Sequence, residues 1–236
     1  ELARKQGAFV FGICNSVGAS IPRATHTGAY IHVGPEIGVA STKAFTGQVT
    51  VLAMLTLALA KARGTISQDE YVKMVRELVA IPEKMKEALQ ANEQIAQMAK
   101  IFTYAHNCLY LGRGYCYPVA LEGALKLKEI SYIHSEAYAA GELKHGTISL
   151  IEDGTLVVAI ATQESLLEKT VSNVKEVKAR GAKVLAIAAE DCTAIEDVAD
   201  EVVYLPKVNH LFTASYDVLP MQLFACLLYT SDAADE

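Results

Sequence analysis

Short apolar runs alternate with longer segments of helical spacing along most of this chain. Compact apolar runs at 7–16 and 28–33 predict two buried strands. The long apolar segment at 41–64 then predicts a helix, with Ser41 as its N-cap and basic residues in its last turn. The first quarter of the sequence therefore predicts strand, strand, helix.

Two more helical segments follow before the next strand. Ser67 and Glu70 have the spacing of a capping box, which predicts a helix start. Pro82 is expected to break or kink that helix, because proline lacks the N–H that the helix interior needs. Helical spacing resumes at 83–102.

The second half of the chain alternates strands with helices. A strand at 108–114 closes on Gly-Arg-Gly, and a helix begins near Pro118, a residue suited to a first turn. After a loop around His145, a strand is predicted at 155–162. A helix at 165–181 follows it.

That helix opens with a second capping box, formed by Ser165 and Glu168. Apolar runs at 182–189 and 201–206 predict two further strands, and a last helix begins near Asn209.

This alternation predicts an α/β protein with parallel, doubly wound sheets. The order strand, short link, strand, long helix occurs at 7–63 and again at 182–229, which predicts two tandem domains. The first copy lacks the front half that precedes the second. We expect the remainder of the first domain with linker helices at 1–90, the second domain at 91–225, and a non-native tail at 226–236.

Composition narrows the classes of function. The 236 residues carry a net charge of −6, which argues against a nucleic-acid partner, because phosphates attract clustered Lys and Arg. Five cysteines lie scattered without metal or disulfide spacing, so we expect no metal and a reducing cytoplasm. The apolar stretch at 49–60 is too short to span a bilayer, and no signal peptide opens the chain.

Titratable residues gather in "LKLKEISYIHSEAYAAGELKHG", at 125–146 and just before it. Glu122, Lys126 and Glu129 follow helical spacing, so they share one face. One interpretation is a solvated, ion-paired stripe. The other is proton-transfer chemistry, favoured by the preceding strand that ends in Gly-Arg-Gly, where sheets of this class bind ligands.

A second group follows in a loop and contains Glu142, Lys144 and His145. A carboxylate beside a lysine, with a histidine nearby, suits sugar isomerisation, which needs a base and a ring-opening acid–base group. His134, beside two hydrophobic residues, is expected to be structural. The Gly- and Ser-rich loop at 34–45 leads into a helix start, which suits either an anion or an ordinary cap.

Two stretches, "PEIGVASTKAFTGQ" and "ALEGALKLKEISYIHSEAYAAGELKHG", resemble the isomerase half of the glutamine:fructose-6-phosphate amidotransferase (glucosamine-6-phosphate synthase) family. The resemblance covers Glu1 to about Ala225. It implies two tandem, doubly wound, flavodoxin-like sugar isomerase (SIS) domains, the first of them truncated at its N-terminus.

The resemblance also implies roles for individual residues. Glu129 would be the base that moves a proton between C1 and C2, and Lys126 would contact the substrate. His145 would open the sugar ring from the neighbouring subunit of a homodimer. The remaining matches lie near the sugar pocket: Val39, Ser41 and Glu122.

The implied chemistry transfers ammonia to fructose 6-phosphate and isomerises the product to glucosamine 6-phosphate, in amino-sugar biosynthesis toward UDP-N-acetylglucosamine. It implies no cofactor and no membrane partner. The family's glutaminase domain is absent, as is the phosphate loop expected before Glu1. "CLLYTSDAADE" stands where the family has a lysine-bearing tail, and Thr147 stands where it has proline. We therefore expect this fragment to be inactive alone.

Two other functions stay open at this point. One is a different SIS-domain sugar-phosphate isomerase or deglycase. The other is a non-catalytic sugar-phosphate sensor, although the sequence shows no basic helix-turn-helix segment.

Overall fold

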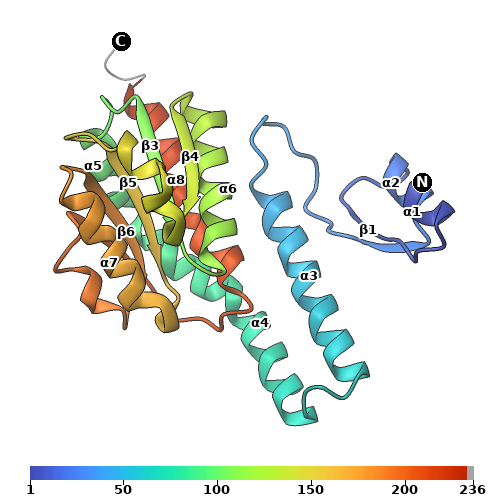
Figure 1. The fold of residues 1–236 in the computed structure, drawn as a ribbon. Helices are drawn as coiled ribbons and strands as arrows, with labels where there is room; N and C mark the ends of the chain where they lie inside the picture. Colours follow the sequence, from blue (N-terminus) through green and yellow to red (C-terminus); the bar gives the residue numbers. More distant parts are fainter. Residues whose placement is uncertain (233–236) are drawn as a thin grey trace. The chain divides into compact units, whose positions relative to one another are not determined.

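The computed structural model describes residues 1–232, which form two compact units (Figure 1). The first unit is Glu1–Leu78, and the second begins at Val79. Contacts therefore divide the chain inside a helix, earlier than the expected domain boundary after residue 90. Each unit is described by itself.

The first unit contains a two-stranded parallel sheet, β1–β2. Gly12 and Gly28 are paired in register, and a Cβ on Gly28 would lie 2.1 Å from the Gly12 carbonyl oxygen. Glycine is therefore required at this close approach. The elements of this unit are α1 Leu2–Lys5, β1 Phe11–Cys14, α2 Ser20–Ala24, β2 Thr27–Tyr30 and α3 Lys43–Ala62.

The start of α3 differs from the prediction. Thr42, not Ser41, is the N-cap, and it makes no side-chain cap hydrogen bond. Ser41 Oγ instead donates to Glu36 Oε1 at 3.2 Å, so its expected role as a cap is wrong. By length and composition α3 is apolar enough to cross a membrane, a property that core helices of soluble proteins share.

The capping box at the next helix is confirmed. Glu70 N donates to Ser67 Oγ at 3.2 Å, and Ser67 N donates to Glu70 Oε2 at 2.8 Å. The helix, α4 Gln68–Ala88, continues through Pro82, so the expected break does not occur. Ile81 beside the proline is buried, and such packing outweighs a single missing hydrogen bond.

The second unit contains a five-stranded parallel sheet in the order β4-β3-β5-β6-β7. Numbered within this unit, the order is 2-1-3-4-5, which is the flavodoxin-like arrangement and confirms the predicted fold class. The strands are β3 Asn107–Gly112, β4 His134–Ala139, β5 Leu156–Ala161, β6 Lys183–Ala189 and β7 Glu201–Leu205.

Helices pack against the second sheet (Figure 1). Val174 and Val177 of α7 join one hydrophobic cluster with β5 and β6, while α5 and α6 pack against α8. Every residue of β5 is buried, as expected of a central parallel strand. The longer helices are α5 Asn92–Ile101, α6 Cys116–Ser131, α7 Leu167–Lys178 and α8 Thr213–Asp232. The 3₁₀ turns are η1 Leu89–Ala91, η2 Ala140–His145, η3 Thr147–Leu150, η4 Glu164–Leu166 and η5 Thr193–Ile195.

Two details of this unit contradict the sequence reading. Ser165 lies inside η4, and the N-cap of α7 is Leu166 without a side-chain cap, so the second capping box is wrong. Strand β4 lies in a stretch for which the sequence predicts a loop after the helix. The helix, α6, ends at Ser131, and Tyr132 after it has a left-handed conformation with φ 58°.

The predicted internal repeat is present in the structure. A parallel pair followed by a 20-residue helix occurs as β1, β2 and α3, and again as β6, β7 and α8. Helix α8 continues beyond Cys226 to Asp232. The last four residues of the expected tail, 233–236, lie outside the described residues.

Candidate active site

Helix α6 carries the predicted titratable face because its other faces are pressed into the second unit. Ala120, Ala124 and Leu127 are buried. Gly123 packs so closely on α8 that a Cβ there would lie 2.2 Å from Met221 Sδ. Small residues thus allow α6 to approach its neighbours closely, and the following turn carries Lys126 into the interior.

Lys126 is fully buried and contacts both glutamates of the face. Its Nζ donates to Glu129 Oε2 and lies 3.5 Å from Glu122 Oε1. The side chains of Glu122 and Glu129 are 12% and 27% exposed. The prediction that the three share one face is confirmed. They do not form a solvated stripe, because the lysine between the carboxylates is removed from water.

Burial shapes the electrostatics of this cluster. Glu122 Oε1 is buried and has no hydrogen-bond partner among residues 1–232, although it lies 3.5 Å from Lys126 Nζ. Desolvation raises the pKa of the Glu122 carboxyl, and Lys126 offsets part of that rise. Glu129 is the more exposed carboxylate, held by a buried cation. A carboxylate fixed in this way can accept a proton from a bound ligand.

His145 lies at the end of η2, apart from this cluster. Its side chain is 76% exposed, and Nε2 lies 3.9 Å from Glu142 Oε2. No contact between His145 and the α6 cluster is found among residues 1–232. Lys144 of the same turn pairs with Glu176 at 2.9 Å. His134, expected to be structural, lies on β4 with Nδ1 3.2 Å from Asn107 Oδ1.

Val39 and Ser41 lie in the first unit, in the segment between β2 and α3. Val39 is 93% exposed. Lys43 Nζ donates to Pro35 O at 2.6 Å, which fixes the turn of this segment. The expectation that Val39 and Ser41 line a sugar pocket stays a prediction.

A cavity of about 560 Å³ opens at the carboxyl ends of the second sheet, and the sequence reading missed it. Residues that follow β5, β6 and β7 line it, among them Thr162, Asp191 and Lys207. Asp217 of α8 also faces it. The rule that open α/β sheets bind ligands at the carboxyl ends of their strands points to these positions. Nothing in the sequence pattern singles out Asp217.

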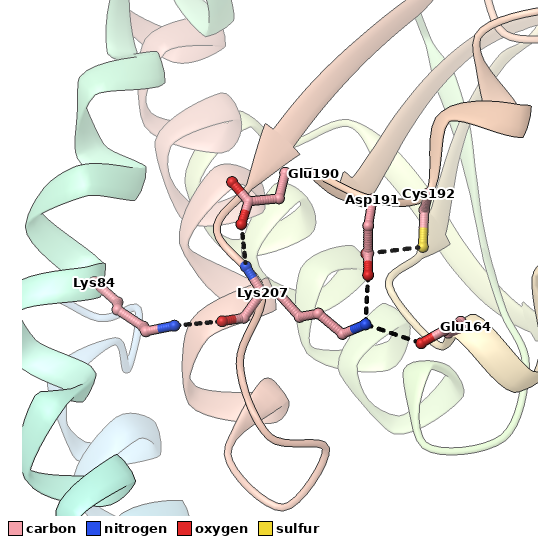
Figure 2. Close-up of polar contacts among 6 residues, drawn as sticks. All are labelled: Lys84, Glu164, Glu190, Asp191, Cys192 and Lys207. Carbon is pink, nitrogen blue, oxygen red and sulfur yellow. Dashed lines mark hydrogen bonds and ion pairs between the residues drawn. The ribbon is translucent and has the colours of Figure 1, made fainter.

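Lys207 forms hydrogen bonds with several segments at the rim of this cavity (Figure 2). Its Nζ donates to Glu164 Oε2 at 2.9 Å and to Asp191 Oδ2. Its backbone carbonyl accepts from Lys84 Nζ, and its backbone N donates to Glu190 Oε1 at 3.4 Å. The hydrogen bonds from Lys207 lower the pKa of Asp191 and raise that of Lys207 itself. The lysine is therefore fully engaged with protein groups.

Asp217 is part of the cavity wall, with 1% of its surface exposed. Thr162 Oγ1 donates to its Oδ2. Burial raises the pKa of Asp217 to about 7, and the Thr162 hydrogen bond only partly opposes that rise.

Sequence comparison finds curated relatives with one shared name. The chain is 60% identical over 225 residues to "Glutamine--fructose-6-phosphate aminotransferase [isomerizing]" of Bacteroides thetaiotaomicron, and 51% identical to the protein of the same name from Chlorobaculum tepidum. These alignments cover 95% of this chain. The chain spans only 37% and 36% of the lengths of those relatives.

The chain is also similar to solved structures. The chain matches the C-terminal domain of glucosamine-fructose-6-phosphate aminotransferase from Francisella tularensis with TM-score 0.93 and 36% identity, covering 98% of this chain and 66% of that one. Tagatose-6-phosphate ketose/aldose isomerase from Escherichia coli matches with TM-score 0.72 and 22% identity, covering 94% and 60% of the two chains, which shows a shared fold. The SIS domain model matches residues 1–58 and 101–231, more than half of the chain, and the chain therefore belongs to the SIS domain family.

Proposed function

We propose that this chain is part of the isomerase half of a glucosamine-6-phosphate synthase. The whole enzyme would convert fructose 6-phosphate and ammonia from glutamine into glucosamine 6-phosphate. One observation carries the proposal: the buried Lys126 holds Glu129 at the surface of α6, in a chain 60% identical to a named aminotransferase. The glutaminase domain of that enzyme would lie outside this sequence.

The isomerisation step assigns a role to each residue of the cluster. Glu129 removes a proton from C1 of the C2 imine and returns it to C2, which converts the ketose skeleton into the amino aldose. Lys126 holds Glu129 in place through their ion pair, and Glu122 lies on the other side of the lysine, 3.5 Å from its Nζ. Val39 and Ser41 contact the sugar, and His145 of a neighbouring subunit opens the ring. The enzyme acts as a cytoplasmic homodimer on the path to UDP-N-acetylglucosamine.

The test uses the complete enzyme with Glu129→Gln, which keeps the shape and removes the proton acceptor. Turnover of fructose 6-phosphate with ammonia should fall at least about a hundredfold, with a much smaller change in KM. Glu168→Gln, on the exposed start of α7, serves as the matched control. Near-normal turnover of the Glu129 variant would remove it from the role of base.

The same assay separates the other SIS functions. Isomerisation of fructose 6-phosphate without incorporation of ammonia would indicate a simple sugar-phosphate isomerase. Saturable binding without turnover in the complete enzyme would indicate a sensor.

A further inference from the structure

The cavity at the carboxyl ends of the second sheet lies beside a helix start, where proteins often bind anions. Its N–H groups and charges, however, do not suit an anion. Helix α6 begins there after Gly114, and a helix start behind a glycine turn usually offers free N–H groups to a phosphate. Here Tyr115 N donates to Gln163 Oε1 at 3.3 Å. A Cβ on Gly114 would lie 2.3 Å from the same oxygen. The side-chain amide oxygen of Gln163 thus occupies the position that an anion would take.

The charges around the cavity also disfavour an anion. Three carboxylates line it, from Glu164, Asp191 and Asp217, against the single lysine Lys207. Lys207 already donates to Glu164 and Asp191, so its charge is neutralised at the rim. Asp217 lines the same cavity, and Lys207 does not pair with it.

The surroundings of the Asp217 carboxylate indicate which ligand the cavity would bind. The side chain is 1% exposed and faces the cavity, and its Oδ2 accepts from Thr162. Thr162 is a neutral donor, and no lysine or arginine forms an ion pair with Asp217 among residues 1–232. A carboxylate with so little exposed surface is stabilised best by a cationic donor.

The remaining wall suits a ring with hydroxyl groups. Tyr115 and His210 both line the cavity, and their rings stack with centroids 6.3 Å apart and an interplanar angle of 28°. Hydroxyl and amide groups of Thr162, Gln163 and Asn209 also line the cavity. A volume of about 560 Å³ lies in the range of small-molecule sites.

We propose that this cavity binds a small polyhydroxylated ring that carries a protonated amine and no phosphate, with the ammonium group on Asp217. The site is separate from the α6 cluster, because Cys116 and Glu129 lie about 20 Å apart along the helix axis. The proposal does not depend on the function proposed above.

Calorimetric titration of the chain 1–236 tests the proposal with three probes. D-glucosamine carries the amine, D-glucose is the matched ring without it, and inorganic phosphate is the anion. We expect glucosamine to bind at least about fivefold more tightly than glucose, as a charge-assisted hydrogen bond predicts, and phosphate not to compete. Equal affinities for the two sugars, or no glucosamine binding at about 10 mM, would overturn the proposal.

Substitutions of the carboxylates test which of them binds the ammonium group. Asp217→Asn should weaken glucosamine binding about tenfold and leave glucose binding within about twofold, while the exposed Asp197→Asn, outside the cavity, changes neither. Asp191→Asn at the rim should weaken glucosamine binding less, and it decides the outcome if Asp217→Asn fails to fold. Unchanged glucosamine binding in folded Asp217→Asn, or a tenfold loss in Glu129→Gln instead, would contradict the assignment.

Discussion

Lys126 is a cation without access to water, and its two glutamates stabilise it. Its side chain is 0% exposed, whereas Glu122 and Glu129 keep some contact with solvent. Removing one partner of a buried ion pair usually costs more than the pair contributes, because the other charge is left uncompensated. Stability and the proposed proton transfer therefore depend on the same atoms.

Lys126→Met keeps the length of the side chain and removes its charge. We expect a loss of about 1–3 kcal/mol in unfolding free energy, because Glu122 would keep a buried, unpaired oxygen, while partial exposure of the glutamates screens the effect. Lys126→Met combined with Glu122→Gln should recover at least about half of that loss. Chemical denaturation measures both.

Lys73→Met is the matched control for this series. Lys73 is 76% exposed and lies 3.9 Å from Glu77, so its loss should change stability by less than about 0.5 kcal/mol. A Lys126→Met protein as stable as this control would contradict the account of the buried pair.

Asp217 makes stability depend on pH in the sense opposite to a salt-bridged carboxylate. Its pKa rises from 3.8 to about 7 on folding, so its contribution is fully present below pH 3.8 and is lost as pH rises through 7. Burial raises the pKa values of the neighbouring Tyr115 and Cys116 to about 12, so both remain neutral in this range. Lys207 stays charged at the rim.

Asp217→Asn removes this titration and keeps a group that can accept from Thr162. The variant should unfold at a higher temperature than the parent at pH 8, with a gain of up to about 4 kcal/mol, and should show no such gain at pH 4. Asp197→Asn, whose side chain is exposed, provides the baseline. A gain of equal size at both pH values would show that something other than ionisation is responsible.

The two capping-box patterns show how local structure depends on context. Ser67–Glu70 forms both reciprocal hydrogen bonds, whereas Ser165 lies within a 3₁₀ turn one residue before the N-cap of α7. The two patterns are alike in sequence. The turn η4 is set by its place beside the cavity, where Gln163 reaches back to Tyr115.

Ser67→Ala should therefore lower unfolding free energy by about 1 kcal/mol, the usual value of an N-cap. Ser165→Ala should change it by only a few tenths of a kcal/mol, because no cap is lost. Thermal unfolding followed by circular dichroism compares them. Equal losses would mean that the hydrogen bonds of the first box contribute little.

The strands and helices that the sequence predicted are those with strong periodicity or long apolar runs. The central strands, the long helices and the repeat of strand, strand, helix all follow from such patterns. Strand β4 does not, because it lies at the edge of the sheet and reads as "HSEAYA", with His134 and Glu136 exposed. Charged residues on an edge strand discourage pairing with other chains, so they also hide the strand from pattern analysis.

Part of the candidate site could likewise be predicted from the sequence, and part of it could not. Helical spacing placed Glu122, Lys126 and Glu129 together, because position along a helix fixes direction. The burial of Lys126 and the cavity around Asp217 depend on how α6 and α8 pack, and one chain's pattern does not reveal such packing. The pattern also pointed to His145, but its ring-opening role comes from the resemblance to a family, and the contact of its side chain in this chain is with Glu142.

His145 leads to a prediction about assembly. If it acts across a subunit interface of the complete enzyme, Glu129→Gln and His145→Ala proteins should each be inactive, and their mixed dimer should regain one composite site with both residues intact. About a quarter of normal activity is expected after random exchange of subunits, since half of the dimers are mixed and each holds one intact site of two. Failure to regain activity after demonstrated exchange would place His145 and Glu129 in the same subunit or outside the reaction.

The sheets of the two units should also differ in how fast their backbone amide hydrogens exchange with solvent. Strand β5 is buried at every residue and bonded on both sides by β3 and β6, whereas β1 and β2 have only each other. Amide hydrogens exchange with solvent through local openings, and a two-stranded sheet opens at little cost in free energy. Deuterium should therefore enter β1 and β2 first, while the amides of β5 exchange only when the second unit unfolds as a whole.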